Sequence, residues 1–193
     1  LGNSFFLKDA LKIYHGEVLR FYLLSTYYRS DFNFNEEDLL SSKKRLDRLY
    51  RLKKRLVGIN FSEIQTSYNK SILDALLDDL NVSKAYAILD EFVSYANDKL
   101  DQNIKDKPIL NDVLSTLKMI EIVLGFGHEN PFTYFQFGLD PTRVEMINTL
   151  ISKRSDAKIA KDFSTSDAIR DELNSMGIAL MDTPNGTVWE IRE

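Results

Sequence analysis

The chain of 193 residues has no cysteine, and its only histidines are His15 and His128. Without cysteine there can be no disulfide bond, thiolate zinc site or cysteine nucleophile. Two histidines far apart in the sequence also argue against a histidine-rich metal site. We therefore predict no metal-binding residue in this chain, and we interpret both histidines as making local hydrogen bonds.

Long apolar runs are missing as well. No stretch approaches the roughly 20 apolar residues that span a bilayer, and no signal-peptide pattern is present. The hydrophobic share of 44% is ordinary for a globular core, and the length suits one large domain or two small ones. We expect a soluble, cytoplasmic protein that does not bind membranes, which the lack of cysteine also favours.

An excess of positive charge is the third absence. The chain has 25 lysines and arginines against 29 aspartates and glutamates, which gives a net charge of −4. This balance argues against a protein that coats nucleic acid by bulk electrostatics, so any RNA contact must be local. The chain begins with Leu1-Gly2-Asn3 instead of an initiator methionine, and we expect it to be a fragment of a longer protein.

Helical periodicity dominates the first two thirds of the sequence. Capping residues and apolar stripes predict six helices, over residues 7–14, 16–28, 36–56, 62–80, 83–103 and 108–124. Asn35 is the expected cap of the third helix, and Gly125 the stop of the last. Since the links are short, we predict an antiparallel α-helical bundle over 36–125, with 1–35 leading into it.

A smaller module is expected at the C-terminal end. The periodicity is lost over 126–139, which we interpret as a linker, and Asp140-Pro141 then opens a helix over 142–161. Ser164 or Thr165 is the predicted cap of a second helix, which ends at Gly177. Two apolar runs around a Pro and Asn-Gly turn predict a β-hairpin, so the fold class is mainly α with an α+β module over 140–193.

Eight short pieces of the sequence, in one order, resemble the cysteinyl-tRNA synthetase family over nearly the whole chain. They are EVLR (17–20), YRS (28–30), NFNEEDL (33–39), LLDDLNVSKA (76–85), AKDF (160–163), RDEL (170–173), GIAL (177–180) and DTPNGT (182–187), with Trp189 after them. Within the fourth piece, Leu80 and Val82 depart from the family pattern. The opening segment looks like the one that follows the family's KMSKS signature.

The resemblance implies that the parent protein attaches cysteine to tRNA(Cys) using ATP. Its HIGH motif, KMSKS loop and zinc ion would lie in a catalytic half that precedes Leu1, so we predict no catalytic residue here and expect the fragment alone to be inactive. ATP and Zn²⁺ are expected only in that missing half. The bundle would be the anticodon-binding, DALR-type bundle of a class I synthetase. The expected partners are tRNA(Cys) and the catalytic domain of the same parent chain, in a monomer.

The family likeness also implies which residues read the GCA anticodon. Carboxylates accept hydrogen bonds from base amino groups, and splayed bases stack on aromatic rings. By position, Phe163 matches the stacking residue. Lys158 replaces the family's usual arginine, and a lysine lacks the planar fork, so phosphate contact is expected there. The predicted anticodon-binding residues are Lys158, Lys161, Phe163, Asp167, Asp182 and Trp189.

A second predicted RNA contact lies in the bundle. Eight of the residues between Lys43 and Arg55 are basic, which makes this helix the most basic surface of the chain. Contacts to the tRNA backbone there would depend strongly on salt. The predicted backbone-binding residues are Arg29, Lys43, Lys44, Arg48 and Arg51.

Structural alternatives remain open for the predicted RNA-binding residues. The alternative for Phe163 is burial at a helix start. For Asp167 it is a capping box with Ser164, and for Asp182 it is an ordinary turn position. Trp189 is also typical of hairpin packing. The basic helix is also typical of a solvated face, and Asp78-Asp79 of a turn instead of a metal site.

Two other functions remain open as well. One is a helical scaffold that binds other proteins. The other is a related ligase that couples cysteine to a small amine and lacks the anticodon-reading end.

Overall fold

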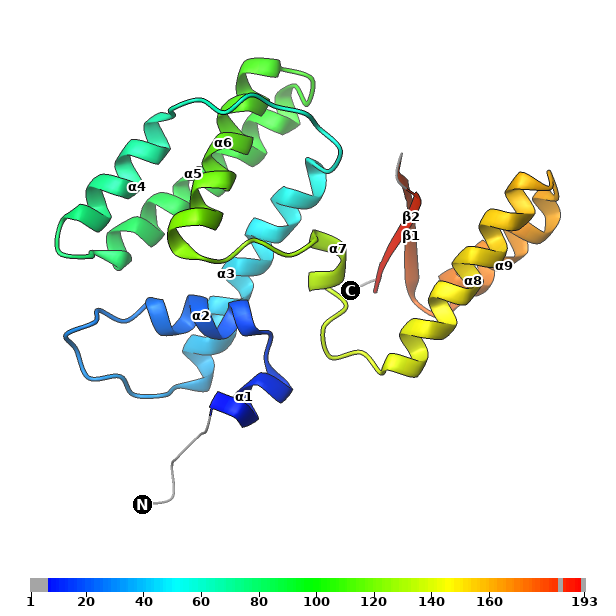
Figure 1. Cartoon of the computed structure of the whole chain (residues 1–193), viewed down its shortest axis with the longest axis horizontal. Helices are drawn as coiled ribbons and strands as arrows, with labels where there is room; N and C mark the ends of the chain where they lie inside the picture. The colour runs from blue at the N-terminus through cyan, green and yellow to red at the C-terminus, as the bar shows by residue number, and fades with distance from the viewer. Residues whose placement is uncertain (1–6, 184–185, 192–193) are drawn as a thin grey trace. The chain divides into compact units, whose positions relative to one another are not determined.

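The computed structural model describes residues 7–183 and 186–191, and it divides into two compact units, Leu1–Glu129 and Asn130–Glu193. Within the described residues there are nine helices and one two-stranded sheet, so the predicted mainly α fold with a terminal hairpin is confirmed (Figure 1). None of the described helices has the length and apolar character that a membrane span requires.

The first unit begins with α1 (Leu7–Ile13), α2 (Gly16–Leu24) and α3 (Glu36–Arg55). The cap of α3 is Asn35 as predicted, because its side-chain oxygen accepts the backbone N–H of Glu37 at 2.9 Å. Helix α2 ends four residues earlier than the sequence pattern indicates, since Ser25 bonds back to the Tyr22 carbonyl. This early end leaves residues 25–34 as an irregular segment.

Three further helices complete the first unit: α4 (Ser67–Leu77), α5 (Val82–Gln102) and α6 (Lys107–Leu124). Helix α4 starts five residues later than predicted, because Thr66 is the cap and accepts the Asn69 N–H at 2.9 Å. Asn81 caps α5, because its side-chain oxygen accepts the backbone N–H of Lys84 at 3.0 Å. Gly125, with φ 71°, ends α6 in the left-handed conformation that glycine adopts without strain.

Aromatic rings and the apolar stripe of α3 form the core of the first unit. Leu46, Tyr50 and Leu52 of α3 are fully buried. The ring of Phe21 stacks on that of Tyr86 with centroids 4.2 Å apart, and the Tyr86 hydroxyl donates to the Phe21 carbonyl at 3.0 Å. Helices α2, α3 and α5 are thereby held together.

The boundary between the two units falls inside the segment predicted as a linker. Phe126 is completely buried in the first unit. The chain after Glu129 belongs to the second unit, where it forms the short helix α7 (Pro131–Tyr134). The Gln136 side chain then donates to the Trp189 carbonyl at 3.0 Å, so this part of the segment is tied to the hairpin.

The second unit consists of α7, α8 (Pro141–Ile159), α9 (Phe163–Ser175) and the antiparallel strands β1 (Ile178–Thr183) and β2 (Gly186–Ile191). Asp182 pairs with Thr187 and Leu180 with Trp189 in the register. The small core consists of Ile147, Ile169, Leu173, Ile178 and Trp189. Residues 184–185 of the predicted turn lie outside the described residues.

One predicted helix cap in this unit is wrong. Asp162 caps α9, where the sequence pattern favours Ser164 or Thr165. Its carboxylate accepts both the backbone N–H of Thr165 at 3.1 Å and the Thr165 hydroxyl at 2.6 Å. An aspartate one position before the first helical residue outcompetes the hydroxyls, because its charge also suits the helix N-terminus.

Candidate functional site

The corner between α8 and α9 presents apolar and basic side chains to solvent. Lys161 has a left-handed backbone with φ 62°, which turns the chain sharply between the two helices. Phe163, the first residue of α9, is 64% exposed, and Ile159 at the end of α8 is 79% exposed. Burial of Phe163 in the core, the structural alternative from the sequence, is therefore wrong.

Asp167 lies one helical turn beyond Phe163 on α9 and is exposed. Residues four positions apart lie on the same face of a helix, so the ring and the carboxylate share one surface. The alternative of a capping box with Ser164 is wrong, because Asp162 is the cap. The carboxylate of Asp167 thus faces solvent beside an exposed aromatic ring.

Asp182 of β1 is held by three side chains. Arg154 of α8 donates from Nη1 to Oδ1 at 2.9 Å and from Nη2 to Oδ2 at 3.2 Å. Thr187 donates its hydroxyl to Oδ1 at 2.7 Å, and Lys158 donates from Nζ to Oδ2 at 2.8 Å. Asp182 is therefore the centre of a charged cluster between α8 and the hairpin.

The charges of this cluster differ in their exposure. The Arg154 side chain is only 5% exposed, whereas those of Lys158 and Asp182 are 41% and 53% exposed. Hydrogen bonds from Arg154, then from Lys158 and Thr187, hold the pKa of the Asp182 carboxyl well below its usual range. The carboxylate is therefore charged at neutral pH and acts only as an acceptor.

Trp189 does not belong to the exposed set. Its side chain is 4% exposed, and the indole Nε1 donates to the Asn148 side-chain oxygen at 2.9 Å. Buried tryptophans use the N–H in this way while the ring fills the core. This placement argues against the predicted base contact of Trp189. Its ring packs in the core between the hairpin and α8.

Seven of the eight basic residues of α3 fall into two groups, and the eighth, Lys54, is half-buried. Arg45, Lys53 and Arg55 face inward and pair with Asp90, Glu121 and Asp101 of α5 and α6. The exposed group is the one predicted from the sequence: Lys43, Lys44, Arg48 and Arg51. Within this exposed group, Lys43 pairs with Asp47 at 2.6 Å and Arg48 donates to the Ser94 hydroxyl at 3.1 Å.

Arg29 lies in a separate cluster around the turn between α4 and α5. Asp79 accepts hydrogen bonds from the hydroxyls of Tyr27 and Tyr28, and Arg29 lies 3.6 Å from its carboxylate. These bonds lower the pKa of Asp79 and raise the pKa of Tyr27 to about 12. The turn interpretation of Asp78-Asp79 is supported, because Asp78 is the cap that ends α4.

Two residues that the sequence pattern did not indicate matter most for this geometry. Arg154 was not predicted because an arginine on a helix is usually solvated, and helical periodicity does not reveal a buried partner on a distant strand. Its spacing of four from Lys158 is a weak signal that both lie on one face of α8. Asn148, whose side-chain oxygen accepts the hydrogen bond from the Trp189 indole N–H, was likewise not predicted.

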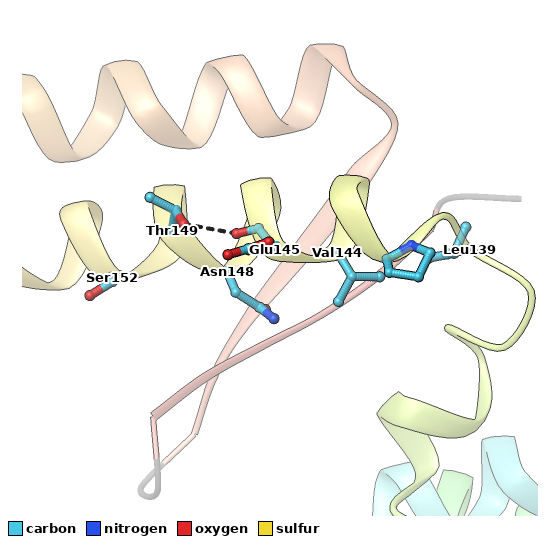
Figure 2. Close-up of a pocket in the computed structure, with 7 residues that line it drawn as sticks. Leu139, Val144, Glu145, Asn148, Thr149 and Ser152 are labelled. Carbon is cyan, nitrogen blue, oxygen red and sulfur yellow. Dashed lines mark hydrogen bonds between the residues drawn. The ribbon is translucent and has the colours of Figure 1, made fainter.

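A shallow depression of about 660 Å³ lies on the first half of α8. Figure 2 shows Val144, Asn148 and Ser152 along one side of the helix, and Thr149 donating to the Glu145 carbonyl at 2.8 Å. None of the predicted RNA-binding residues lines this depression. Within the part of the chain that the structure describes, no three side chains are grouped as a metal site would require.

The sequence of this chain is similar to known proteins over nearly its whole length. Residues 1–44 match the model of the class I (C) tRNA synthetase catalytic domain, and residues 72–128 match the model of the DALR domain. Curated cysteine–tRNA ligases align with 190 residues of the chain. The chain corresponds to the C-terminal portion of cysteine–tRNA ligases.

Among these ligases, that of Aliarcobacter butzleri is 57% identical, that of Nitratiruptor sp. 55% and that of Helicobacter pylori strain J99 53%. In each case the alignment covers 98% of this chain and 41% of the ligase. The similarity to cysteine–tRNA ligases thus includes the C-terminal unit, and it favours this family over a helical scaffold.

Proposed function

We propose that this chain is the tRNA-binding, anticodon-recognising part of a cysteine–tRNA ligase, with the GCA anticodon of tRNA(Cys) as its target. The observation that carries the proposal is the exposed ring of Phe163 beside the exposed carboxylate of Asp167 on one face of α9. A large aromatic ring at a helix start gains nothing for the fold when it faces water. A binding role accounts for it.

Base stacking and hydrogen bonding would both contribute to RNA binding at this surface. The ring of Phe163 offers a face on which an unstacked base can lie, and Asp167 and Asp182 offer acceptors for exocyclic amino groups. Lys158 and Lys161 supply positive charge next to these acceptors, suited to the RNA phosphates. Trp189 has no direct contact in this proposal, since it is buried.

The exposed face of α3 supplies the sequence-independent part of binding. Lys44, Arg48 and Arg51 recur at spacings of four and three, so they form one stripe along the helix. Such a stripe fits a phosphate backbone, and Lys43 lies next to it on the same helix. Arg29 would contact the backbone from the separate cluster around Asp79. Local charge of this kind is compatible with a net charge of −4 for the whole chain.

The catalytic activity belongs, in this proposal, to a longer parent chain. The relatives are ligases, and ATP and zinc would be bound outside the present residues. The chain has no cysteine, and its described residues hold no cluster of three metal-binding side chains, so they do not fit a zinc ion. We expect the chain alone to be catalytically inactive, cytoplasmic and monomeric, and to pack against the catalytic domain of its parent.

The test uses a labelled tRNA(Cys) transcript and measures its binding by fluorescence anisotropy at low salt. The wild-type chain should bind it more tightly than transcripts with substituted anticodon bases. Phe163→Ala should weaken binding by about 1–3 kcal/mol, the usual contribution of one stacked base, and leave thermal stability unchanged. Phe137→Ala, which removes another exposed phenylalanine of the second unit, is the matched control. Equal affinity for all anticodons would refute the proposal.

A further inference from the structure

The carboxylate of Asp182 has no unused acceptor position in this structure. Oδ1 accepts from Arg154 and Thr187, and Oδ2 accepts from Arg154 and Lys158. A carboxylate has about four lone-pair sites, so these four hydrogen bonds saturate it. A base can bind to Asp182 only if one of the present donors leaves.

The three donors differ in how easily they leave. Arg154 is 5% exposed, and its Nε is buried without a hydrogen-bond partner. Removing the carboxylate from its fork would leave a buried charge with almost no compensation, which is costly. Thr187 is fixed opposite Asp182 by the pairing of β1 and β2. Arg154 therefore cannot leave Asp182 without a large cost, and the backbone of Thr187 stays opposite Asp182.

Lys158 is different because its long, flexible side chain is 41% exposed. An exposed ion pair contributes little, since water solvates the separated charges well. Rotation of the Lys158 side chain would open one acceptor position on Oδ2 while Arg154 and Thr187 keep the carboxylate in place. The released ammonium would remain within reach of an RNA phosphate.

We propose that Arg154 is a positioning residue for base recognition, and that Lys158 is an exchangeable occupant that an exocyclic amino group displaces from Oδ2 of Asp182. The inference rests on the proposed RNA-binding function. It assigns opposite roles to these two basic residues of α8. Arg154 keeps the Asp182 carboxylate oriented, and Lys158 occupies Oδ2 while no RNA is bound. An alternative in which Arg154 only stabilises the fold predicts no effect on base preference.

The test is a double-mutant cycle on base discrimination. Binding of RNA hairpins with the GCA loop, and with each loop base substituted in turn, is measured for the wild type, Arg154→Met, Asp182→Asn and the double variant. We expect Arg154→Met to reduce discrimination at one loop base about tenfold, as expected for one base contact. The same substitution should cost no further discrimination in the Asp182→Asn background, because it acts through that carboxylate.

Lys158→Met provides the opposite signature. It should keep or increase discrimination at the same base, because the competing donor is gone, and it should reduce the salt dependence of binding. Loss of discrimination in Lys158→Met, or an additive loss from Arg154→Met in the Asp182→Asn background, would overturn the inference. An Arg154→Met variant without any change in discrimination would do so as well.

Two controls keep the outcomes separate. If the wild type shows no preference for the GCA loop, the proposed function fails and the inference fails with it. If only the cycle fails, the proposed function stands. Should Arg154→Met not fold, Thr187→Val removes a single donor from Oδ1. Thr187→Val should then show a smaller loss of base discrimination, and this loss should disappear in the Asp182→Asn background. The same loss in both backgrounds would refute the positioning role.

Discussion

Two carboxylates, one in each unit, each accept several hydrogen bonds yet serve different purposes. In the first unit, Glu17 accepts from the Tyr50 hydroxyl at 2.5 Å and from the backbone N–H groups of Gly127 and His128 at 2.8 and 3.0 Å. Tyr50 is fully buried, and its pKa is raised by burial and by the bond to Glu17. Gly127 and Tyr50 are buried, so their N–H and hydroxyl groups cannot exchange Glu17 for water without opening the unit.

In the second unit, the donors to Asp182 include the exposed ammonium of Lys158, and the carboxylate itself is 53% exposed. The number of hydrogen bonds is therefore a poor guide to the role of a carboxylate. What separates the two is whether a donor can leave without unfolding its surroundings. The donors to Glu17 cannot leave in this way, so we interpret it as a structural residue. Lys158 can leave Asp182, so we interpret Asp182 as a residue that can exchange a donor.

The largest expected effect concerns the support of the Asp182 cluster. Trp189→Ala should destabilise the second unit by about 3–5 kcal/mol, because it leaves a cavity in a small core. Amide hydrogen exchange should show lost protection in α8, α9 and the hairpin, with the first unit unchanged. Met181→Ala on the neighbouring strand, where the side chain is 44% exposed, is the control and should have little effect. A small effect of Trp189→Ala would place the indole outside the core.

A smaller effect is expected from breaking the structural carboxylate. Glu17→Gln should destabilise the first unit by about 1.5–3 kcal/mol, the range for hydrogen bonds to a charged group. Base discrimination by the second unit should not change. Thermal unfolding and hairpin binding measure the two outcomes, with Glu37→Gln at the exposed start of α3 as the control. Altered discrimination in Glu17→Gln would end the distinction between the two carboxylates.

The third prediction concerns the pH dependence of the stability that Asp182 contributes. Its pKa is lower in the folded chain than the ordinary value of about 3.9. A lowered pKa contributes stability that is present above the unfolded-state value and is lost as the pH falls toward the folded-state value. Wild type should therefore be more stable than Asp182→Asn at pH 7, and this difference should shrink below about pH 4. A difference that is constant with pH would contradict the ion-pair origin of the shift.

Much of the fold follows from local sequence signals. Asn35 and Asp140 act as caps where the sequence places them, and Gly125 and Gly177 end their helices with positive φ. These signals are local because a cap bonds only to residues two or three positions away. The hairpin was predictable for the same reason.

Errors arose where partners distant in the sequence decide the outcome. Whether the linker after Gly125 docks on the bundle was left open by the sequence, and the structure shows Phe126 buried and the following amides bonded to Glu17, more than 100 positions away. The burial of Trp189 against α8 and the pairing of Arg154 with Asp182 are likewise contacts between separate elements. The exposure of Phe163 could not be predicted from periodicity, which leaves both burial and exposure open for a residue at a helix start.

The smallest effect concerns the first unit, whose contribution to RNA binding should be purely electrostatic. Replacing Lys44, Arg48 or Arg51 with glutamine should lower the slope of log affinity against log salt by roughly 0.7–0.9 for each lost phosphate contact. Preference for the GCA loop should stay the same, because phosphate contacts position the RNA without reading it. Lys70→Gln on α4, another exposed lysine in an ion pair, is the matched control and should leave the slope unchanged. A change in base preference from an α3 substitution would show that the first unit also takes part in reading, and the two units would then no longer divide binding and recognition between them.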